Sequence, residues 1–457
     1  MKNTRLTVVA GLIASTFSTV VYAETTDLEN LYQLALQNDP LLSQAKVGAS
    51  MAEEAVNVTR ASLLPQLNSY FAYQYLQDHR GVEAGFGGTG NAVALGVKGS
   101  QLLYSPAVKL AVDIANQDVT HADLLIEKAS DALVLRSAKA YFDVLRASET
   151  VKVAEANLAA IDEFRVQTET RVRLGMTAAL DLQEAQARFD LASAGIINAK
   201  ALLAQRLDAL TTLTGQTFTN VEPLDISRFS PALPSPIYGD TWQHAALNNN
   251  HDLRMTAQAI EKARLQIKQA SAGRMPSVVF TAGINQELLM DIKNIGGNSA
   301  LGAKLDNLTE VEVGVAAQLP LYSGGRTTAL VRLAQHGLEM TQLVNDQSMR
   351  QVAEQVNTTE RFVEASLLSL KAHEQSLASS EAALTAVEKG YEVGARTMAE
   401  VLAATGLVYA AQNNVNNARF DFIERALTLK FLAGELSDND ITALNAGLLR
   451  TSSSTSK

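Results

Sequence analysis

The chain has 457 residues, of which 47% are hydrophobic and 19% charged, and its 38 basic and 48 acidic side chains give a formal net charge of −10. An apolar fraction this high excludes a disordered chain. The acidic balance argues against a nucleic-acid-binding protein, which needs a basic face. The absence of cysteine excludes disulfides, thiolate metal sites and a lipid anchor on cysteine.

Residues 1–23 have the pattern of a cleavable secretory signal peptide. Lys2 and Arg5 precede an uncharged apolar run, and Val21 and Ala23 are small residues placed before a cut at Glu24. A retained membrane anchor is the less favoured alternative, because the run is short. Since no later apolar run is long enough for a transmembrane helix, the mature chain is expected to stay extracytoplasmic or to enter a membrane as a β-barrel.

The prolines are distributed unevenly along the chain. None falls between Pro106 and Pro223, and none follows Pro320. Because a proline inside a helix costs about 3 kcal/mol, the two proline-free tracts predict very long helices.

The second half of the sequence repeats the first. Pro65 aligns with Pro276, and Gly175 with Gly394. A repeat of this length predicts a duplicated unit with pseudo-twofold symmetry.

Each repeat is expected to contain an opening helix, a β-hairpin and a long helical hairpin. The first repeat covers 24–215, with its helix at 27–63, its β-hairpin at 66–104 and its helical turn near 175. The second covers 239–434, with its helix at 239–274, its β-hairpin at 277–322 and its turn near 394. A proline-rich strap over 216–238 joins them, and 435–457 forms a C-terminal segment with a flexible tail.

The predicted strands have one apolar and one polar face. Val311, Val313 and Val315 alternate with Glu310 and Glu312, a period of two. Strands of about 13 residues can cross a bilayer when tilted, but four strands cannot close a barrel, and lipid does not tolerate open edges. We therefore expect a homotrimer with a barrel of about 12 strands; a soluble hairpin domain on a helical stalk is the alternative.

Several short motifs accompany this order. They are Ala35-Leu36-Gln37-Asn38-Asp39-Pro40 and its repeat, the Leu-Tyr-Ser strand ends, Arg173-Leu174-Gly175, Tyr391-Glu392-Val393-Gly394 and Leu436-Ser437-Asp438-Asn439-Asp440. With them, the chain resembles the TolC family of outer-membrane efflux and secretion ducts over essentially all of its mature length. The resemblance implies a mainly α fold with membrane β-structure, in which a trimeric barrel in the Gram-negative outer membrane continues into a periplasmic α-helical barrel.

The resemblance also implies a function without enzymatic activity or cofactor. The chain would be the passive exit duct of a tripartite export machine, fed by an inner-membrane transporter (an ABC or proton-driven pump) through a periplasmic adaptor, and would contact outer-membrane lipid. The alternative is a barrel-anchored structural or adhesive coiled-coil surface protein, which would need only one anchoring hairpin. The sequence does not distinguish drugs from secreted proteins as the cargo, because the inner-membrane pump selects the cargo.

The resemblance further implies that the helical tips close the periplasmic entrance and meet the adaptor. The tip residues are Arg173, Leu174, Gly175, Met176, Val393, Gly394 and Ala395. A gate latch would pair Arg396 with Asp181, with Tyr391 as a further latch residue. Glu400 would form an acidic ring at the entrance, whereas the second carboxylate of the family pattern is replaced by Ala403.

The residue types of common catalytic and metal sites do not occur at the spacings that such sites need. The six histidines show no ligand spacing. Gly87-Gly88-Thr89-Gly90 resembles a phosphate loop only in composition and is expected to be a turn between strands. We therefore expect neither a catalytic nor a metal site.

Overall fold

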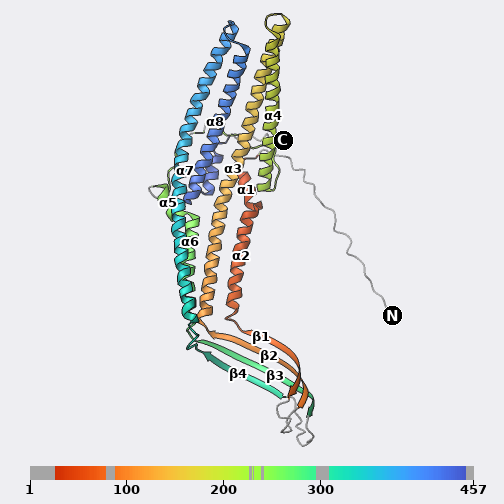
Figure 1. The fold of residues 1–457 in the computed structure, drawn as a ribbon, viewed down its shortest axis with the longest axis vertical. Coiled ribbons are helices and arrows are strands. Elements are labelled where there is room, and N and C mark those ends of the chain that lie inside the picture. The colour runs from red at the N-terminus through yellow and green to blue at the C-terminus, as the bar shows by residue number, and fades with distance from the viewer. Residues whose placement is uncertain are drawn as a thin grey trace, which may run out of the picture.

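The computed structural model describes residues 26–78, 88–225, 229, 231–237, 241–294 and 308–448. The predicted signal peptide, the part of the predicted glycine-rich turn up to Gly87 and the tail beyond 448 are outside the described residues. Gly88, Thr89 and Gly90, which were expected in that turn, belong to a strand instead. The chain is a long helical rod with a sheet at one end and two helical tips at the other (Figure 1).

Four long helices form most of the rod. Helix α3 (Pro106–Arg173) returns as α4 (Ala179–Thr214), and α7 (Arg326–Glu392) returns as α8 (Met398–Ala433). The 68 residues of α3 span roughly 100 Å at 1.5 Å per residue, as the proline-free tracts predicted. None of the described helices is both long and apolar enough to cross a membrane.

The opening segment of each repeat is two helices, so the single helices predicted at 27–63 and 239–274 were wrong. Helices α1 (Leu28–Asn38) and α2 (Pro40–Ala61) are separated at Asp39, whose carboxylate caps α2 by accepting a hydrogen bond of 3.0 Å from the Leu41 N–H. Asn250 plays the same part between α5 (Trp242–Asn249) and α6 (His251–Ala272). A side chain that caps the next helix competes with continuation of the previous one.

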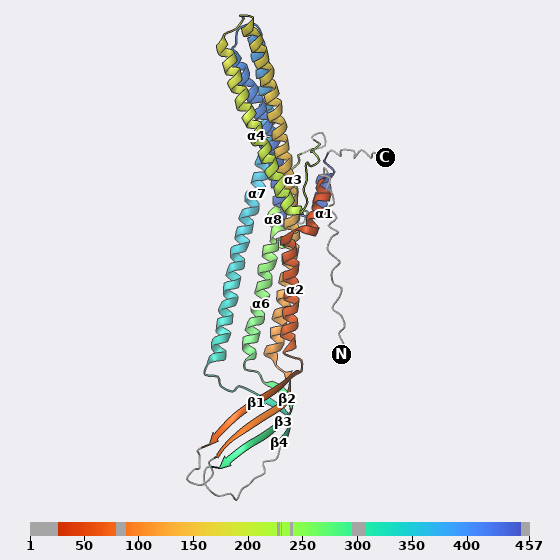
Figure 2. The ribbon, with the colours of Figure 1, turned by 90° about the vertical axis from the view of Figure 1, so that its right-hand side faces the viewer.

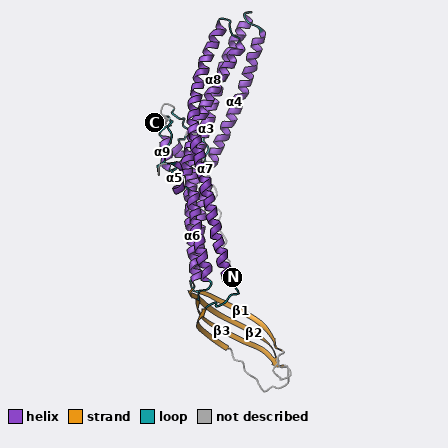
Figure 3. Ribbon diagram, turned by 60° about the vertical axis from the view of Figure 1, so that its left-hand side comes forward, coloured by secondary structure: helices purple, strands orange, loops and turns teal. Residues whose placement is uncertain are grey.

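The sheet is antiparallel and joins the two repeats. Strands β1 (Gln66–Asp78), β2 (Gly88–Tyr104), β3 (Ser277–Asn294) and β4 (Leu308–Gln318) lie side by side in chain order. The register places Leu67, Gly99, Ala282 and Val313 in one row across the sheet, so the predicted apolar faces of all four strands coincide. Figure 3 shows the sheet continuing the helical rod.

The main buried cluster surrounds the middle of the rod. It joins α1, α3, α4, α8 and the short C-terminal helix α9 (Asp438–Asn445), and its largest buried side chains include Tyr32, Tyr141 and Phe142. The strap crosses the same level, where Val221 pairs with Thr26 and Leu224 with Leu448. The C-terminal segment, which was not expected to contain a helix, thus packs beside α1 and contributes to this buried cluster (Figure 2).

One ion pair fastens the break between α1 and α2 to α3. The Asp39 carboxylate is buried and accepts hydrogen bonds from the guanidinium of Arg136. Burial raises the pKa of Asp39, but the bonds from Arg136 and from the Leu41 N–H outweigh it and leave the pKa below its usual value.

The end of α8 packs tightly against the junction of α5 and α6. Gly434 has φ +70°, and a Cβ built on it would lie 2.3 Å from the carbonyl oxygen of Asn249. Next to it, the Asn250 amide donates a hydrogen bond of 2.8 Å to the Leu432 carbonyl. Only glycine allows this approach of two backbones.

We predict that Gly434→Ala destabilises the protein by about 3 kcal/mol or more, since it adds a backbone clash to the strain of a left-handed conformation. Gly394→Ala is the matched control, because Gly394 also has a positive φ, +76°, but open space around it; it should cost only about 1 kcal/mol. Thermal unfolding of the purified proteins in detergent measures both. Equal shifts in the unfolding midpoint would contradict the role of the contact.

Candidate functional site

The two helical tips end with the same backbone geometry. Gly175 and Gly394 have φ values of +70° and +76°. The Met176 N–H bonds the Arg171 carbonyl and the Ala395 N–H bonds the Gly390 carbonyl, both at 2.8 Å. This six-to-one bond, together with the left-handed glycine, is the Schellman helix end, so the repeated glycines produce two equivalent turns.

The tips expose large apolar side chains. Leu174, Met176 and Val393 are 67%, 72% and 80% exposed, and Arg173 and Ala395 beside them are exposed as well. Apolar side chains gathered at the end of a rod are typical of a surface that another protein covers.

Glu400 is held by its own helix end. One of its oxygens accepts a hydrogen bond of 2.7 Å from the Thr397 N–H, and the other accepts one of 2.9 Å from the Arg396 guanidinium. The first bond completes a capping box with Thr397. The bonds from the Thr397 backbone and from Arg396 keep the pKa of Glu400 below its usual value. The Glu400 carboxylate is therefore ionised at neutral pH.

Asp181 and Arg396 are not brought together within one chain. The Asp181 carboxylate accepts a hydrogen bond from the Thr177 hydroxyl in the first hairpin, while Arg396 bonds Glu400 in the second. The expected latch between them stays a prediction and would have to join neighbouring copies.

Tyr391 lies where the two hairpins meet. Its ring packs beside a buried cluster that includes Met398, Val401 and Leu402. The guanidinium carbon of Arg171, on α3, lies 4.9 Å from the centroid of the Tyr391 ring. Arg171 was not expected from the sequence, because nothing local distinguishes it from the neighbouring Arg173; only the packing of the first hairpin on the second, through α3 and α8, brings it to Tyr391.

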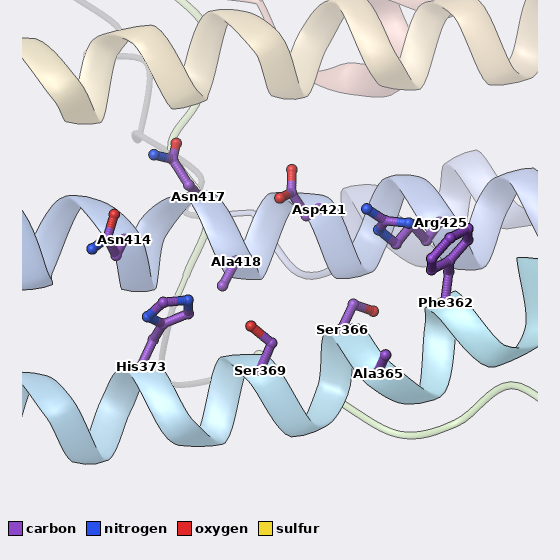
Figure 4. Close-up of a pocket in the computed structure, with 10 residues that line it drawn as sticks. All are labelled: Phe362, Ala365, Ser366, Ser369, His373, Asn414, Asn417, Ala418, Asp421 and Arg425. Carbon is purple, nitrogen blue, oxygen red and sulfur yellow. The ribbon is translucent and has the colours of Figure 1, made fainter.

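A groove between α7 and α8 contains the residue types of a hydrolase triad, namely Ser369, His373 and Asp421 (Figure 4). No hydrogen bond joins these three side chains, and Asp421 is paired instead with Arg146 at 2.8 Å. The described part of the chain also contains no cluster of three His, Asp or Glu residues arranged to hold a metal ion. The groove therefore has the residues of a triad without its geometry.

Comparisons with known proteins identify the family. The sequence model of the outer membrane efflux protein family matches residues 31–216 and 242–435, which are the two repeats. The chain is 32% identical over 433 residues to the outer membrane protein TolC of Vibrio cholerae, covering 95% of this chain and 96% of that protein. It is 29% identical to TolC of Escherichia coli, covering 97% and 89%.

The fold agrees with this assignment. The crystal structure of the Campylobacter jejuni CmeC outer membrane channel superposes with a TM-score of 0.71 at 15% identity, covering 98% of each chain. The predicted fold class is confirmed, since the chain combines long helices with a four-stranded antiparallel sheet and shares its fold with outer membrane channels of known structure. The function class is confirmed as an efflux or secretion duct, whereas the adhesin alternative finds no support.

The family members are channels and not enzymes, as expected, and their place in the outer membrane of Gram-negative bacteria supports the predicted location. With both repeats matched and the fold shared along the whole chain, this protein belongs to the outer membrane efflux protein family.

Proposed function

We propose that three copies of this chain close into a continuous exit duct, which carries drugs or secreted proteins from an inner-membrane transporter through a periplasmic adaptor to the outside. The observation that carries the proposal is that, among the described residues, a single chain has strand edges without a partner and exposed apolar helix faces along both of its flanks.

The sheet is unfinished at β1 and β4. Among the described residues, each of these strands pairs on one side only, while Leu67, Phe71, Val311 and Val313 expose an apolar face. In lipid, the free backbone groups of such edges must find partners. The β4 edge of one copy can pair with the β1 edge of the next, because these two strands are antiparallel in the repeating order.

The helical rod exposes apolar side chains on the same two flanks. Helix α2 packs on α3, α3 on α6, and α6 on α7, which leaves α2 and α7 outermost. Helix α2 exposes Val47, Met51 and Val58 at helical spacing, and α7 exposes Leu333 and Met340. An apolar stripe on each flank suits a head-to-tail contact between copies, which closes into a ring. Three copies would supply about 12 strands, enough for an open channel.

The tips suit the adaptor-facing entrance of this duct. Their exposed apolar residues offer a contact surface, and the three Glu400 carboxylates would surround the axis. With Ala403 in place of a second carboxylate, each copy contributes one charge at this level. The latch between Arg396 and Asp181 of neighbouring copies would hold the entrance closed. A cleaved signal peptide would deliver the chain to the outer membrane.

We predict that Met340→Asp prevents stable trimer formation, because it buries a charge in the contact between copies. Gln335→Asp is the matched control, since Gln335 is exposed on the same helix but lies about 140° around it from Met340, and it should leave the trimer intact. Light scattering of the detergent-solubilised proteins gives the masses. An intact Met340→Asp trimer would contradict the assignment of this flank.

We predict that Arg396→Gln and Asp181→Asn each raise the single-channel conductance in planar bilayers, because either change breaks the latch. Glu400→Gln removes the partner of Arg396 within the chain but leaves Asp181 in place, so it should have a smaller effect. Unchanged conductance in both latch variants would refute the pair.

Deletion of the gene from its own bacterium should sensitise the cells to drugs, abolish the export of particular proteins, or both, because the duct serves whichever pump docks on it. Drug susceptibility and the composition of the culture medium measure the two outcomes. If a strain that lacks other members of the family shows neither drug sensitivity nor loss of exported proteins after the deletion, that result would argue against an export role.

A further inference from the structure

The two repeats meet in a contact whose elements recur on the outer flanks of the chain. Helix α3 of the first repeat packs on α6 of the second, and strand β2 pairs with β3. Helix α7 and strand β4 are the second-repeat equivalents of α3 and β2, while α2 and β1 are the first-repeat equivalents of α6 and β3. The internal contact is therefore a template for the contact between the α7 flank of one chain and the α2 flank of the next.

The strands of the two repeats are equivalent residue by residue. Gln66 and Ser100 are partners in the first hairpin. The residues aligned with them, Ser277 and Gln318, are partners in the second hairpin. The duplication has thus preserved the register of the sheet, so an internal pairing can be transferred to the outer edges.

The pairing between the hairpins supplies the register for those edges. Val97 on β2 is the partner of Ile284 on β3. The residues aligned with these two are Val315 on β4 and Tyr73 on β1, which are 65% and 60% exposed. The template therefore places Val315 of one chain beside Tyr73 of the next, as an aromatic and β-branched pair across the strands.

The long helices are equivalent in the same way. Four residues that are buried in α3 align with four residues that are buried in α7. The aligned residues are Leu133 and Val352, Ser137 and Val356, Val144 and Val363, and Val151 and Leu370. Because the two helices turn the same face to the core, they also turn the same face to the helix beside them.

The internal contact of α3 with α6 is polar. Three ion pairs with N···O distances of 2.5 to 2.6 Å cross it. These ion pairs are Lys262 with Asp118, Arg254 with Glu127, and Lys128 with Asp252. Among them, the Gln258 amide donates a hydrogen bond of 2.6 Å to the Gln117 side chain. Charge matching therefore selects α6 as the neighbour of α3.

The outer flanks have lost these charges. The aligned residues are Met51 and Gly337 in place of Lys262 and Asp118, Ser43 and Asp346 in place of Arg254 and Glu127, and Leu41 and Gln347 in place of Asp252 and Lys128. Met51 is 69% exposed. A Cβ built on Gly337 would have nothing within 4 Å. In the template, an exposed apolar side chain on one flank thus faces a position without a side chain on the other.

We propose that neighbouring chains meet in the register of the internal contact, so that the Met51 side chain of one copy packs on Gly337 of the next. This inference rests on the proposed trimer and adds the partner of each flank residue. The exchange of ion pairs for apolar contacts also makes the two contacts exclusive. Helix α6 cannot replace α2 of a neighbour, because Lys262 would be buried at Gly337 without a carboxylate. The exchange directs α7 to a second copy and α3 to its own chain.

The register is tested by disulfide cross-linking of the full-length protein, which has no cysteine of its own. Met51→Cys combined with Gly337→Cys should give linked dimers and trimers on denaturing gels after oxidation, because a disulfide needs Cα atoms about 4.4–6.8 Å apart. Met51→Cys combined with Val344→Cys is the matched control. Val344 is on the same side of α7 but about 10 Å further along the helix, so this pair should stay unlinked.

The strands give a second, independent measurement of the register. Val315→Cys combined with Tyr73→Cys should link neighbouring chains, since the template makes these residues direct partners. Val315→Cys combined with Tyr75→Cys should link much less, because Tyr75 is about 7 Å further along the same face of β1.

Moving an internal ion pair into the outer contact tests the exchange of charges. Met51→Lys should lose most of the trimer in light scattering, because it buries a charge without a partner. Adding Gly337→Asp should restore the trimer, since the two new side chains are those of Lys262 and Asp118. Adding Gln335→Asp instead supplies the same charge on another side of α7 and should not restore it. If Gly337→Asp does not fold, the cysteine pairs still decide the register.

The outcomes distinguish this inference from the proposed function. A wild-type trimer in which Met51→Cys links to Val344→Cys as well as to Gly337→Cys overturns the register alone. Restoration by Gln335→Asp as complete as that by Gly337→Asp overturns the exchange of charges. A wild-type protein that is monomeric in detergent, with no linked chains from any cysteine pair, overturns the proposed trimer and this inference with it.

Discussion

The structure depends on one constraint, which is that the backbone N–H and C=O groups of strands in lipid must all be hydrogen-bonded. The chain meets it internally at three strand pairings, and the pairing of β2 with β3 joins the two halves of the duplication. In the part of the chain that the structure describes, the outer edges of β1 and β4 have no partner strand. The helices that continue from the sheet inherit this order, since α2 and α7 are outermost in the rod as β1 and β4 are in the sheet. The order of strands in one open sheet thus determines which helices, α2 and α7, have exposed flanks along a rod of about 100 Å.

Duplication supplies the framework of the tips, and divergence supplies their chemistry. Gly175 and Gly394 close equivalent helix ends, but equivalent positions before them differ. Arg171 in the first hairpin corresponds to Gly390 in the second. A Cβ on Gly390 would lie 2.6 Å from Cγ of Arg396, so the glycine makes room for the Arg396 side chain beside the helix. The first hairpin instead extends its arginine to the ring of Tyr391. The symmetric backbone therefore carries an asymmetric set of contacts between the hairpins.

The middle of the rod shows how local and distant interactions cooperate. Asp39 is a good helix cap by residue type alone, and Pro40 after it favours a helix start. The sequence pattern nevertheless predicts a continuous helix over 27–63, because the apolar periodicity passes through the break. The buried Asp39 carboxylate is accommodated there by Arg136, which is distant in sequence. Without that partner the break would bury an uncompensated charge. Similarly, α9 forms where the C-terminal segment packs against α1.

The sequence by itself determined the β-hairpin and the long helical hairpin of each repeat, because proline positions, the period-two faces of the strands and the repeated glycines all act locally and agree with one another. It also determined that one chain cannot be the whole assembly, since four strands cannot close a barrel. Only the tertiary structure decided which side chains meet at the tips. Arg171 and Tyr391 are far apart in the chain, and their contact depends on how the first hairpin packs on the second, mainly α3 on α8, which no local pattern encodes.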